Sequence, residues 1–219
     1  MITLHHIAYS RSFRILWLLT EMGLDCALEH YAITDGSLRT PEFKAKSPAG
    51  RVPALEIDGR VIYESGAIVE YLCASRPELG LGRSFGDEDY VAWLEWLHFA
   101  ETQASILASL NMCHLFMGTP SAASATTMKL EAARLKATLK AMEKKLEGQE
   151  WLLASGFSAV DTMMGFNLFS AQHFVKLDEF ANIRAYMARI EARPAYQKAR
   201  ELDGEQAFYT QDFYEVPEG

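Results

Sequence analysis

In the first third of the chain, hydrophobic and polar positions follow short patterns whose period changes repeatedly. Residues 2–8 and 27–33 have the pattern of β-strands, and residues 13–22 and 41–46 have the pattern of helices. Gly23 supports one of these boundaries, because glycine commonly follows the last residue of a helix. This part of the chain is therefore predicted to alternate strands with helices.

A β-hairpin followed by a helix is predicted for residues 50–72, GRVPALEIDGRVIYESGAIVEYL. Residues 53–57 alternate at period two, Asp58-Gly59 supplies a two-residue turn, and residues 60–63 return as the partner strand. A helix then opens at Ser65. The resulting order, βαβαββα, predicts an α+β domain with helices layered on a small mixed sheet.

Strand patterns stop after residue 82, and helical patterns replace them. Residues 76–82 break the periodicity with one proline and two glycines, as expected of a linker. Helices are predicted over 87–117 (ended by Gly118-Thr119-Pro120), 123–146, 162–174, 181–192 and 196–202. We therefore expect a first domain at 1–78, a linker at 79–86, and an all-α helical bundle at 87–219.

Two further features of the second domain have a structural interpretation. Ser158 and Asp161 have the spacing of a capping box at the start of an apolar helix, so neither is expected to be catalytic. Four rings near the C-terminus suggest that the tail packs back onto the domain, since disordered tails are poor in aromatic residues. These rings belong to Phe208, Tyr209, Phe213 and Tyr214.

Composition excludes several classes of protein. The 219 residues are 49% hydrophobic and carry a net charge of −8, which argues against a nucleic-acid-binding surface. The sequence has no long apolar run, so no transmembrane helix is expected, and no secretory signal is visible. Cys26, Cys73 and Cys113 form neither a CxxC pair nor a metal signature, which suits a reducing cytoplasm.

Two residue pairs around the hairpin suggest ligand chemistry. Pro53 begins a strand, where it cannot donate to the sheet, and its bond to Val52 can be cis. Glu64 and Ser65 place a carboxylate and a hydroxyl at a helix N-terminus, beside backbone N–H groups suited to a carboxylate ligand. The structural alternative for the second pair is a helix cap beside a solvated acid.

These residues resemble the glutathione-binding half of the cytosolic glutathione transferases, and the resemblance extends over residues 1–203. It implies a thioredoxin-like first domain and an all-helical second domain that receives the electrophile. In that family, the residue before a cis-proline pairs its backbone with the cysteinyl part of glutathione, and an acid–serine pair holds the γ-glutamyl end. The resemblance therefore makes Val52, Pro53, Glu64 and Ser65 binding-site candidates.

The chemistry that the resemblance implies depends on the segment from Tyr9 to Arg14. A thiol with a pKa near 8.5 is mostly protonated at neutral pH, so the site must favour the thiolate. Serine-type members of the family place a hydroxyl donor four residues before an arginine, and Ser10 matches that spacing. Ser12 is the competing donor, although a helix-cap role would also explain it. Tyr9 is a third, poorer fit.

The resemblance adds further contacts around these serines. Phe13 joins Ser10 among the substrate-binding candidates, and Arg51 could pair with the glycine carboxylate of glutathione, with Lys44 as an alternative. Gly50 stands where several related classes keep a polar side chain, which weakens any detailed transfer of that contact. The class within the serine-type branch, whether bacterial, fungal or theta-like, stays open.

Two adjacent histidines suggest a metal or acid–base site. His5 and His6 lie within the first predicted strand and point to opposite faces, so they cannot jointly bind one ion. We expect one to be partly buried and the other to face outward. No metal site is predicted.

The leading hypothesis is thus a cytoplasmic glutathione transferase that conjugates the glutathione thiolate to small apolar electrophiles. Glutathione would be a co-substrate, with no permanently bound cofactor, and the resemblance implies a homodimer with neither nucleic-acid nor membrane partners. One alternative is a glutathione-dependent peroxidase or reductase, although residues 9–14 lack the cysteine of a glutaredoxin-like mechanism. Another is a non-catalytic binding protein with the same fold.

Overall fold

The computed structural model describes residues 1–116 and 124–216, which belong to two compact units. The first unit contains residues 1–90 and 191–207. The second contains residues 91–190 and the chain from 208 onward. Among the described residues, the helices are all too short or too polar to span a lipid bilayer.

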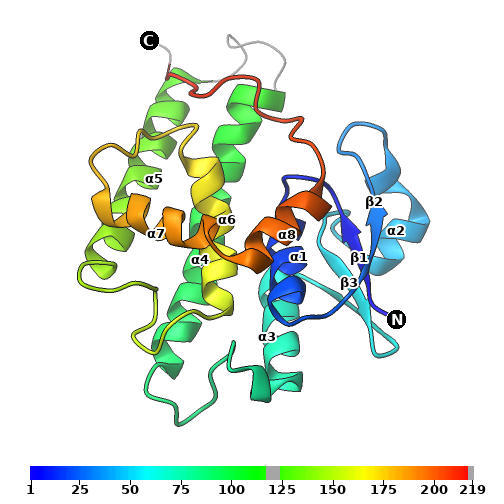
Figure 1. Cartoon of the computed structure of the whole chain (residues 1–219). Coiled ribbons are helices and arrows are strands. Elements are labelled where there is room, and N and C mark those ends of the chain that lie inside the picture. Colours follow the sequence, from blue (N-terminus) through cyan, green and yellow to red (C-terminus); the bar gives the residue numbers. More distant parts are fainter. Residues whose placement is uncertain (117–123, 217–219) are drawn as a thin grey trace. The chain divides into compact units, whose positions relative to one another are not determined.

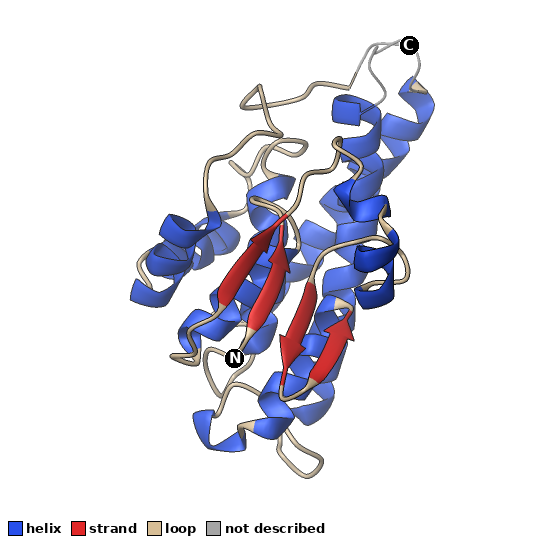
Figure 2. Cartoon of the chain, turned by 90° about the vertical axis from the view of Figure 1, so that its right-hand side faces the viewer, coloured by secondary structure: helices blue, strands red, loops and turns tan. Residues whose placement is uncertain are grey.

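A four-stranded mixed sheet forms the centre of the first unit (Figure 2). Its strands are β1 (Thr3–His6), β2 (Ala27–His30), β3 (Ala54–Ile57) and β4 (Arg60–Tyr63). They lie in the order β2-β1-β3-β4, with β1 parallel to β2 and antiparallel to β3. This arrangement, with the helices that follow, confirms the predicted βαβαββα order.

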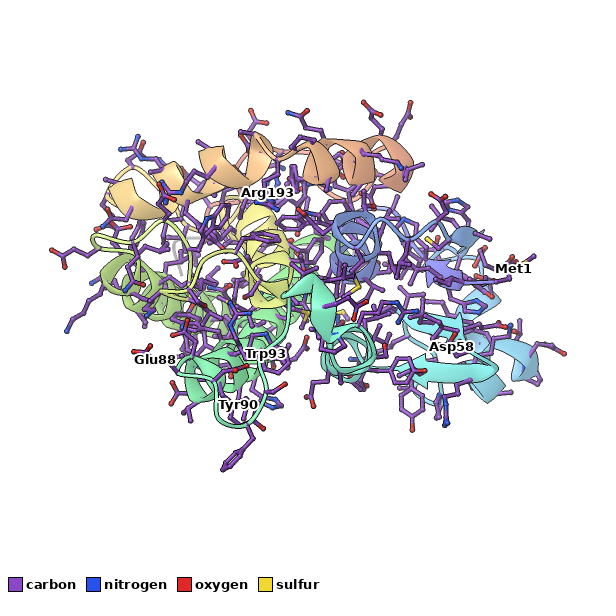
Figure 3. All side chains as sticks on the ribbon, turned by 60° about the horizontal axis from the view of Figure 1, so that its bottom comes forward. Met1, Asp58, Glu88, Tyr90, Trp93 and Arg193 are labelled. Carbon is purple, nitrogen blue, oxygen red and sulfur yellow. The ribbon has the colours of Figure 1, made fainter. Side chains whose placement is uncertain are left out.

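The helices of this unit begin and end close to the predicted residues. They are α1 (Ser12–Glu21), α2 (Pro41–Lys46) and α3 (Ser65–Ser75). Gly23 has φ +67° and ends α1, where the N–H of Leu24 donates to the carbonyl of Leu19 at 2.9 Å. At the hairpin turn, Asp58 (labelled in Figure 3) and Gly59 have φ values of 52° and 71°, as a tight two-residue turn requires.

A helix from the far end of the chain completes the first unit. α8 (Pro194–Asp203) packs against α1 (Figure 1). The ring of Tyr196 lies edge-on to Trp17 at 4.9 Å and to Phe13 at 5.7 Å. The sequence predicts this helix as part of the second domain, because helical periodicity does not reveal which domain a helix packs against. The predicted second domain, 87–219, thus differs from the second compact unit in residues 87–90 and 191–207.

The second unit contains helices joined by loops, with no strand among its described residues. Its helices are α4 (Tyr90–Asn111), continued by a π-helical turn (Met112–Phe116), then α5 (Ala125–Lys145), α6 (Ala159–Ala171) and α7 (Ala181–Glu191). The stop predicted at Gly118-Thr119-Pro120 lies outside the described residues. Of the aromatic and methionine positions along α4 and its π turn, Trp93 is buried, whereas Met112 and Phe116 are exposed. The two exposed side chains both belong to the π-helical turn.

The capping box and the aromatic tail both have structural roles in this unit. Asp161 is fully buried and accepts hydrogen bonds from the Ser158 N–H and the Tyr186 hydroxyl, both at 2.7 Å. In the tail, Tyr209 stacks on His173 at 3.9 Å, and Tyr214 is buried. The tail therefore packs onto the helices, as its composition predicted.

Candidate functional site

A small pocket of about 80 Å³ lies in the first unit, where the loop before β3 meets the start of α3. Its lining contains five of the residues that the sequence singled out. The lining residues are Arg11, Ser47, Ala49, Arg51, Val52, Pro53, Glu64 and Ser65. The fold thus brings together the Val-Pro and Glu-Ser pairs, which lie on different sides of the hairpin. Ser10, Ser12 and Phe13 are not part of this lining.

The acid–serine pair lies at the N-terminus of α3. Glu64 is the N-cap residue and is exposed, whereas Ser65 is the first residue of the helix and is only 4% exposed. Glu64 adopts φ 70°, which is uncommon for a residue other than glycine and often marks a functional position. A helix N-terminus beside a hydroxyl group is a favourable environment for a carboxylate.

The opposite wall of the pocket is the loop that contains Val52 and Pro53. The bond between them is cis, and both residues are buried. Ser47 holds this loop, because its hydroxyl donates to the carbonyl of Arg51 at 2.7 Å and accepts from the Arg51 N–H at 3.3 Å. The backbone around Val52 is thereby fixed beside the α3 N-terminus.

The structure explains why glycine occupies position 50 in this loop. Gly50 has φ +62°, and a Cβ atom added there would lie 2.8 Å from the carbonyl oxygen of Leu38. A polar side chain at this position would therefore need both a strained backbone and a rearranged loop. Any contact to a ligand carboxylate must come from another residue, such as Arg51.

The two candidate serines lie in the turn between β1 and α1 and have different environments. Ser10 is half-buried, and its Oγ accepts from the N–H of Ser12 at 3.2 Å. Ser12 is fully buried, and its Oγ lies 2.8 Å from both Ser10 Oγ and His6 Nδ1. The helix-cap alternative for Ser12 does not hold: Arg11 is the N-cap residue, and the Ser12 hydroxyl accepts from the N–H of Ile7, directly after β1. Because Ser12 is buried and Ser10 is half-buried, Ser10 is the better placed of the two hydroxyls to contact a ligand.

Comparison with known proteins agrees with this geometry. The chain matches the family model "Glutathione S-transferase, N-terminal domain" over residues 1–74 and "Glutathione S-transferase, C-terminal domain" over residues 108–194. It is 31% identical to Glutathione S-transferase 3 of Schizosaccharomyces pombe over 219 residues, covering 92% of this chain and 87% of the relative. The chain belongs to the glutathione S-transferase family.

Solved structures of this family have the same fold. A glutathione transferase from Methylococcus capsulatus is 26% identical, with a TM-score of 0.80 over 93% of this chain and 98% of that one. A glutathione transferase from Burkholderia graminis, with two glutathione molecules bound per subunit, has a TM-score of 0.81 at 24% identity and covers 91% of this chain and 87% of its own. At that identity, the second likeness shows the fold alone.

One residue of the pocket, Arg11, was not predicted from the sequence of this family member. Arg11 lines the pocket together with Arg51, so two guanidinium groups flank it. The signal was available, because Arg11 lies between the two candidate serines in the sequence. Lys44, the alternative to Arg51, is exposed and does not belong to the lining.

Phe13 also differs from its expected role as a substrate-binding residue. Its side chain is fully buried, with its ring next to Tyr196 and the guanidinium of Arg200 at 4.3 Å. It therefore packs α1 against α8 and presents no side-chain surface to a ligand. The correction has a simple origin: neighbouring residues at the start of a helix point in different directions.

The expectation for the two histidines was wrong as well, because both are buried. His5 is 1% exposed and His6 is 0% exposed, because the ring of His5 lies 5.9 Å from that of Phe43 in α2 and His6 contacts Asp203 in α8. His5 contacts the hydroxyl of Tyr31 at 2.9 Å and the carboxylate of Glu56 at 2.8 Å. Among the described residues, no group of histidine, cysteine and acidic side chains is arranged to hold a metal ion.

Proposed function

We propose that this family member is an active glutathione transferase that conjugates the glutathione thiolate to small apolar electrophiles. The observation that carries the proposal is the single pocket that joins the cis Val52-Pro53 segment to Glu64 and Ser65. A protein that had kept only the fold would have no need of a polar pocket with these residues. Membership of the family supports the same conclusion.

Charge complementarity supports glutathione as the molecule in the pocket. Glutathione carries one ammonium group and two carboxylates at neutral pH, and the pocket offers one acid and two arginines. Glu64 would pair with the ammonium group, and Ser65 with the α3 N-terminus would hold the γ-glutamyl carboxylate. The glycine carboxylate would pair with Arg51 or Arg11. The cysteinyl part would pair with the backbone of Val52.

Ser10 would then act on the sulfur. Its hydroxyl would donate a hydrogen bond to the thiolate, and each pKa unit of lowering needs about 1.4 kcal/mol of preferential stabilisation. With an aryl halide, the thiolate sulfur forms a bond to carbon and halide leaves with its bonding electron pair. The rate gain would come from the higher thiolate population and from the orientation of two bound reactants.

We also propose a cytoplasmic homodimer. The edge strand β4 exposes the apolar side chains of Val61 (45%) and Tyr63 (47%), and covering such an edge with a second copy would stabilise both. Cys26, Cys73 and Cys113 are free thiols, which suits a reducing compartment. Light scattering at micromolar concentration tests the dimer: a mass near the 24.6 kDa of one chain would rule it out.

Calorimetric titration with glutathione, followed by a conjugation assay with a generic aryl halide, tests the proposed activity. We expect saturable binding and enzyme-dependent formation of the thioether. Binding without turnover would favour the non-catalytic alternative, and turnover of a peroxide without turnover of the halide would favour a peroxidase. Failure to bind glutathione would contradict the proposal.

A further inference from the structure

A continuous line of polar side chains runs from the candidate donor into the interior of the first unit. Ser10 Oγ lies 2.8 Å from Ser12 Oγ, and Ser12 Oγ lies 2.8 Å from His6 Nδ1. The other ring nitrogen of His6 lies 3.2 Å from Oδ1 of Asp203 in α8. Ser12, His6 and Asp203 are all 0% exposed, so only the Ser10 end approaches the surface.

Donors on α8 and in the β1–α1 turn fix the carboxylate of Asp203. It accepts from the backbone N–H of Tyr9 at 3.1 and 3.3 Å and from the guanidinium of Arg200 at 3.2 Å. Because the Asp203 carboxylate can only accept a hydrogen bond from Nε2, neutral His6 carries its ring proton on that nitrogen. His6 Nδ1 is then an acceptor, and at 2.8 Å it lies closer to the Ser12 hydroxyl than the competing carbonyl of Ile7 does at 3.2 Å.

The charged and titratable groups around His6 come from two elements. Asp203 and, through it, Arg200 belong to α8, and the ring of His30 in β2 lies edge-on at 5.6 Å. The Asp203 carboxylate would pair with an imidazolium formed at His6 when a negative charge forms at the other end of the serine pair.

We infer that His6 receives the proton of bound glutathione through Ser10 and Ser12, with Asp203 holding the ring in place. The inference rests on the proposed function, because it needs glutathione with its sulfur at the Ser10 hydroxyl. Only Ser10 would contact the sulfur. The three residues behind it act on the substrate through Ser10 and are therefore positioning residues: Ser12, His6 and Asp203.

Three proton shifts along existing hydrogen bonds complete the step. The thiol proton moves to Ser10 Oγ as the Ser10 proton moves to Ser12 Oγ, and the Ser12 proton moves to His6 Nδ1. Each serine is a neutral hydroxyl before and after, the sulfur becomes a thiolate, and the imidazole becomes an imidazolium paired with Asp203. The shift also leaves the Ser10 hydroxyl donating to the thiolate, which is the orientation that stabilises it.

Counting protons tests this transfer in the unmodified protein. Titrations with glutathione at pH 7, in buffers of different ionisation enthalpy, give the protons released on binding. The same titrations with S-methylglutathione, which has no ionisable thiol, give the protons exchanged on binding by all groups other than the thiol. Thiolate formation is followed in parallel by its ultraviolet difference spectrum. We expect thiolate without additional proton release, because the proton stays on His6.

The two hypotheses fail in different ways in this experiment. A spectrum without thiolate would contradict the proposed function of Ser10. Release of about one proton for each thiolate formed would overturn the role of His6. It would leave the proposed function of Ser10 standing.

His6→Asn gives a second readout, because asparagine can accept the Ser12 hydrogen bond but cannot take up a proton. We expect thiolate to form only at higher pH in this variant. Each thiolate formed should now be accompanied by the release of about one proton to the solvent. His30→Asn removes the neighbouring exposed imidazole and should leave the proton count unchanged. A purely structural role for His6 would change the stability without changing the proton count. If His6→Asn does not fold, the count in the unmodified protein still decides.

Discussion

Glu21 and Arg193 form a two-pronged ion pair although 172 positions separate them in the sequence. The Nε and Nη2 atoms of Arg193 donate to the two carboxylate oxygens of Glu21 at 2.7 and 2.8 Å. Glu21 also accepts from the indole N–H of Trp17 at 2.8 Å. This pair anchors the start of α8 to α1, and the end of α8 brings Asp203 to the Ser10 turn.

Because this pair is mostly buried, its loss should be costly. The side chains of Arg193 and Glu21 are 28% and 7% exposed. Arg193→Ala should lower the free energy of unfolding by about 2 kcal/mol, since it leaves a buried carboxylate short of its partner. Lys136→Ala is the control, because the side chains of Lys136 and its partner Glu179 are 43% and 53% exposed and their pair should contribute about 0.5 kcal/mol or less. Equal losses in urea unfolding would contradict an anchoring role.

The proposed γ-glutamyl site predicts a specific loss of affinity. Ser65→Ala removes a buried hydroxyl beside the α3 N-terminus, and losing a charge-assisted hydrogen bond should cost about 2 kcal/mol. The dissociation constant of glutathione should therefore rise by about 30-fold in calorimetric titration.

A serine at the other end of the same helix provides the control for Ser65. Ser75→Ala removes a hydroxyl that bonds to the carbonyl of Leu72, far along α3 from the pocket. It should leave the affinity for glutathione unchanged. If Ser65→Ala bound glutathione as tightly as the unmodified protein, the γ-glutamyl group would have to lie elsewhere.

The acidic group beside His5 should make stability depend on pH. Hydrogen bonds from Lys46 and then His5 hold the pKa of Glu56 below its ordinary value near 4.5. A depressed carboxyl pKa stabilises the folded chain above that ordinary value. This contribution is lost as the pH falls from about 4.5 through the folded-state pKa.

Glu56→Gln should therefore lower the stability at pH 7, and the difference should shrink as the pH falls below about 4.5. The effect should be modest, because the side chains of Glu56 and Lys46 are each more than one third exposed. Glu70→Gln, an exposed acid on α3, should show no comparable pH dependence. A loss at pH 3 as large as that at pH 7 would contradict the ion-pair explanation.

The local elements could be predicted well because their signals are local. The period-two pattern with Asp58-Gly59 specifies the hairpin, and Pro41 specifies the start of α2. The pocket residues were found because the Val-Pro and Glu-Ser pairs each carry their own chemistry within a few positions. What could not be predicted is the partner of each element across the fold.

The errors around the Ser10 turn all come from one long-range contact. No pattern near residue 200 announces that α8 packs on α1, so Asp203 was not connected with His6 or with the turn. The same gap hid the burial of Phe13 and of His6. His5 is covered by other partners, because its ring lies 5.9 Å from that of Phe43 in α2.

The central claim, that the Ser10 hydroxyl stabilises the glutathione thiolate, is tested most directly by titrating the bound thiol. The ultraviolet difference spectrum of the thiolate is followed against pH for the unmodified protein and for Ser10→Ala. We expect Ser10→Ala to keep the affinity for glutathione within a few fold and to raise the pH of thiol ionisation by about one to two units. An unchanged ionisation pH in Ser10→Ala, with a shift in Ser12→Ala, would contradict the account.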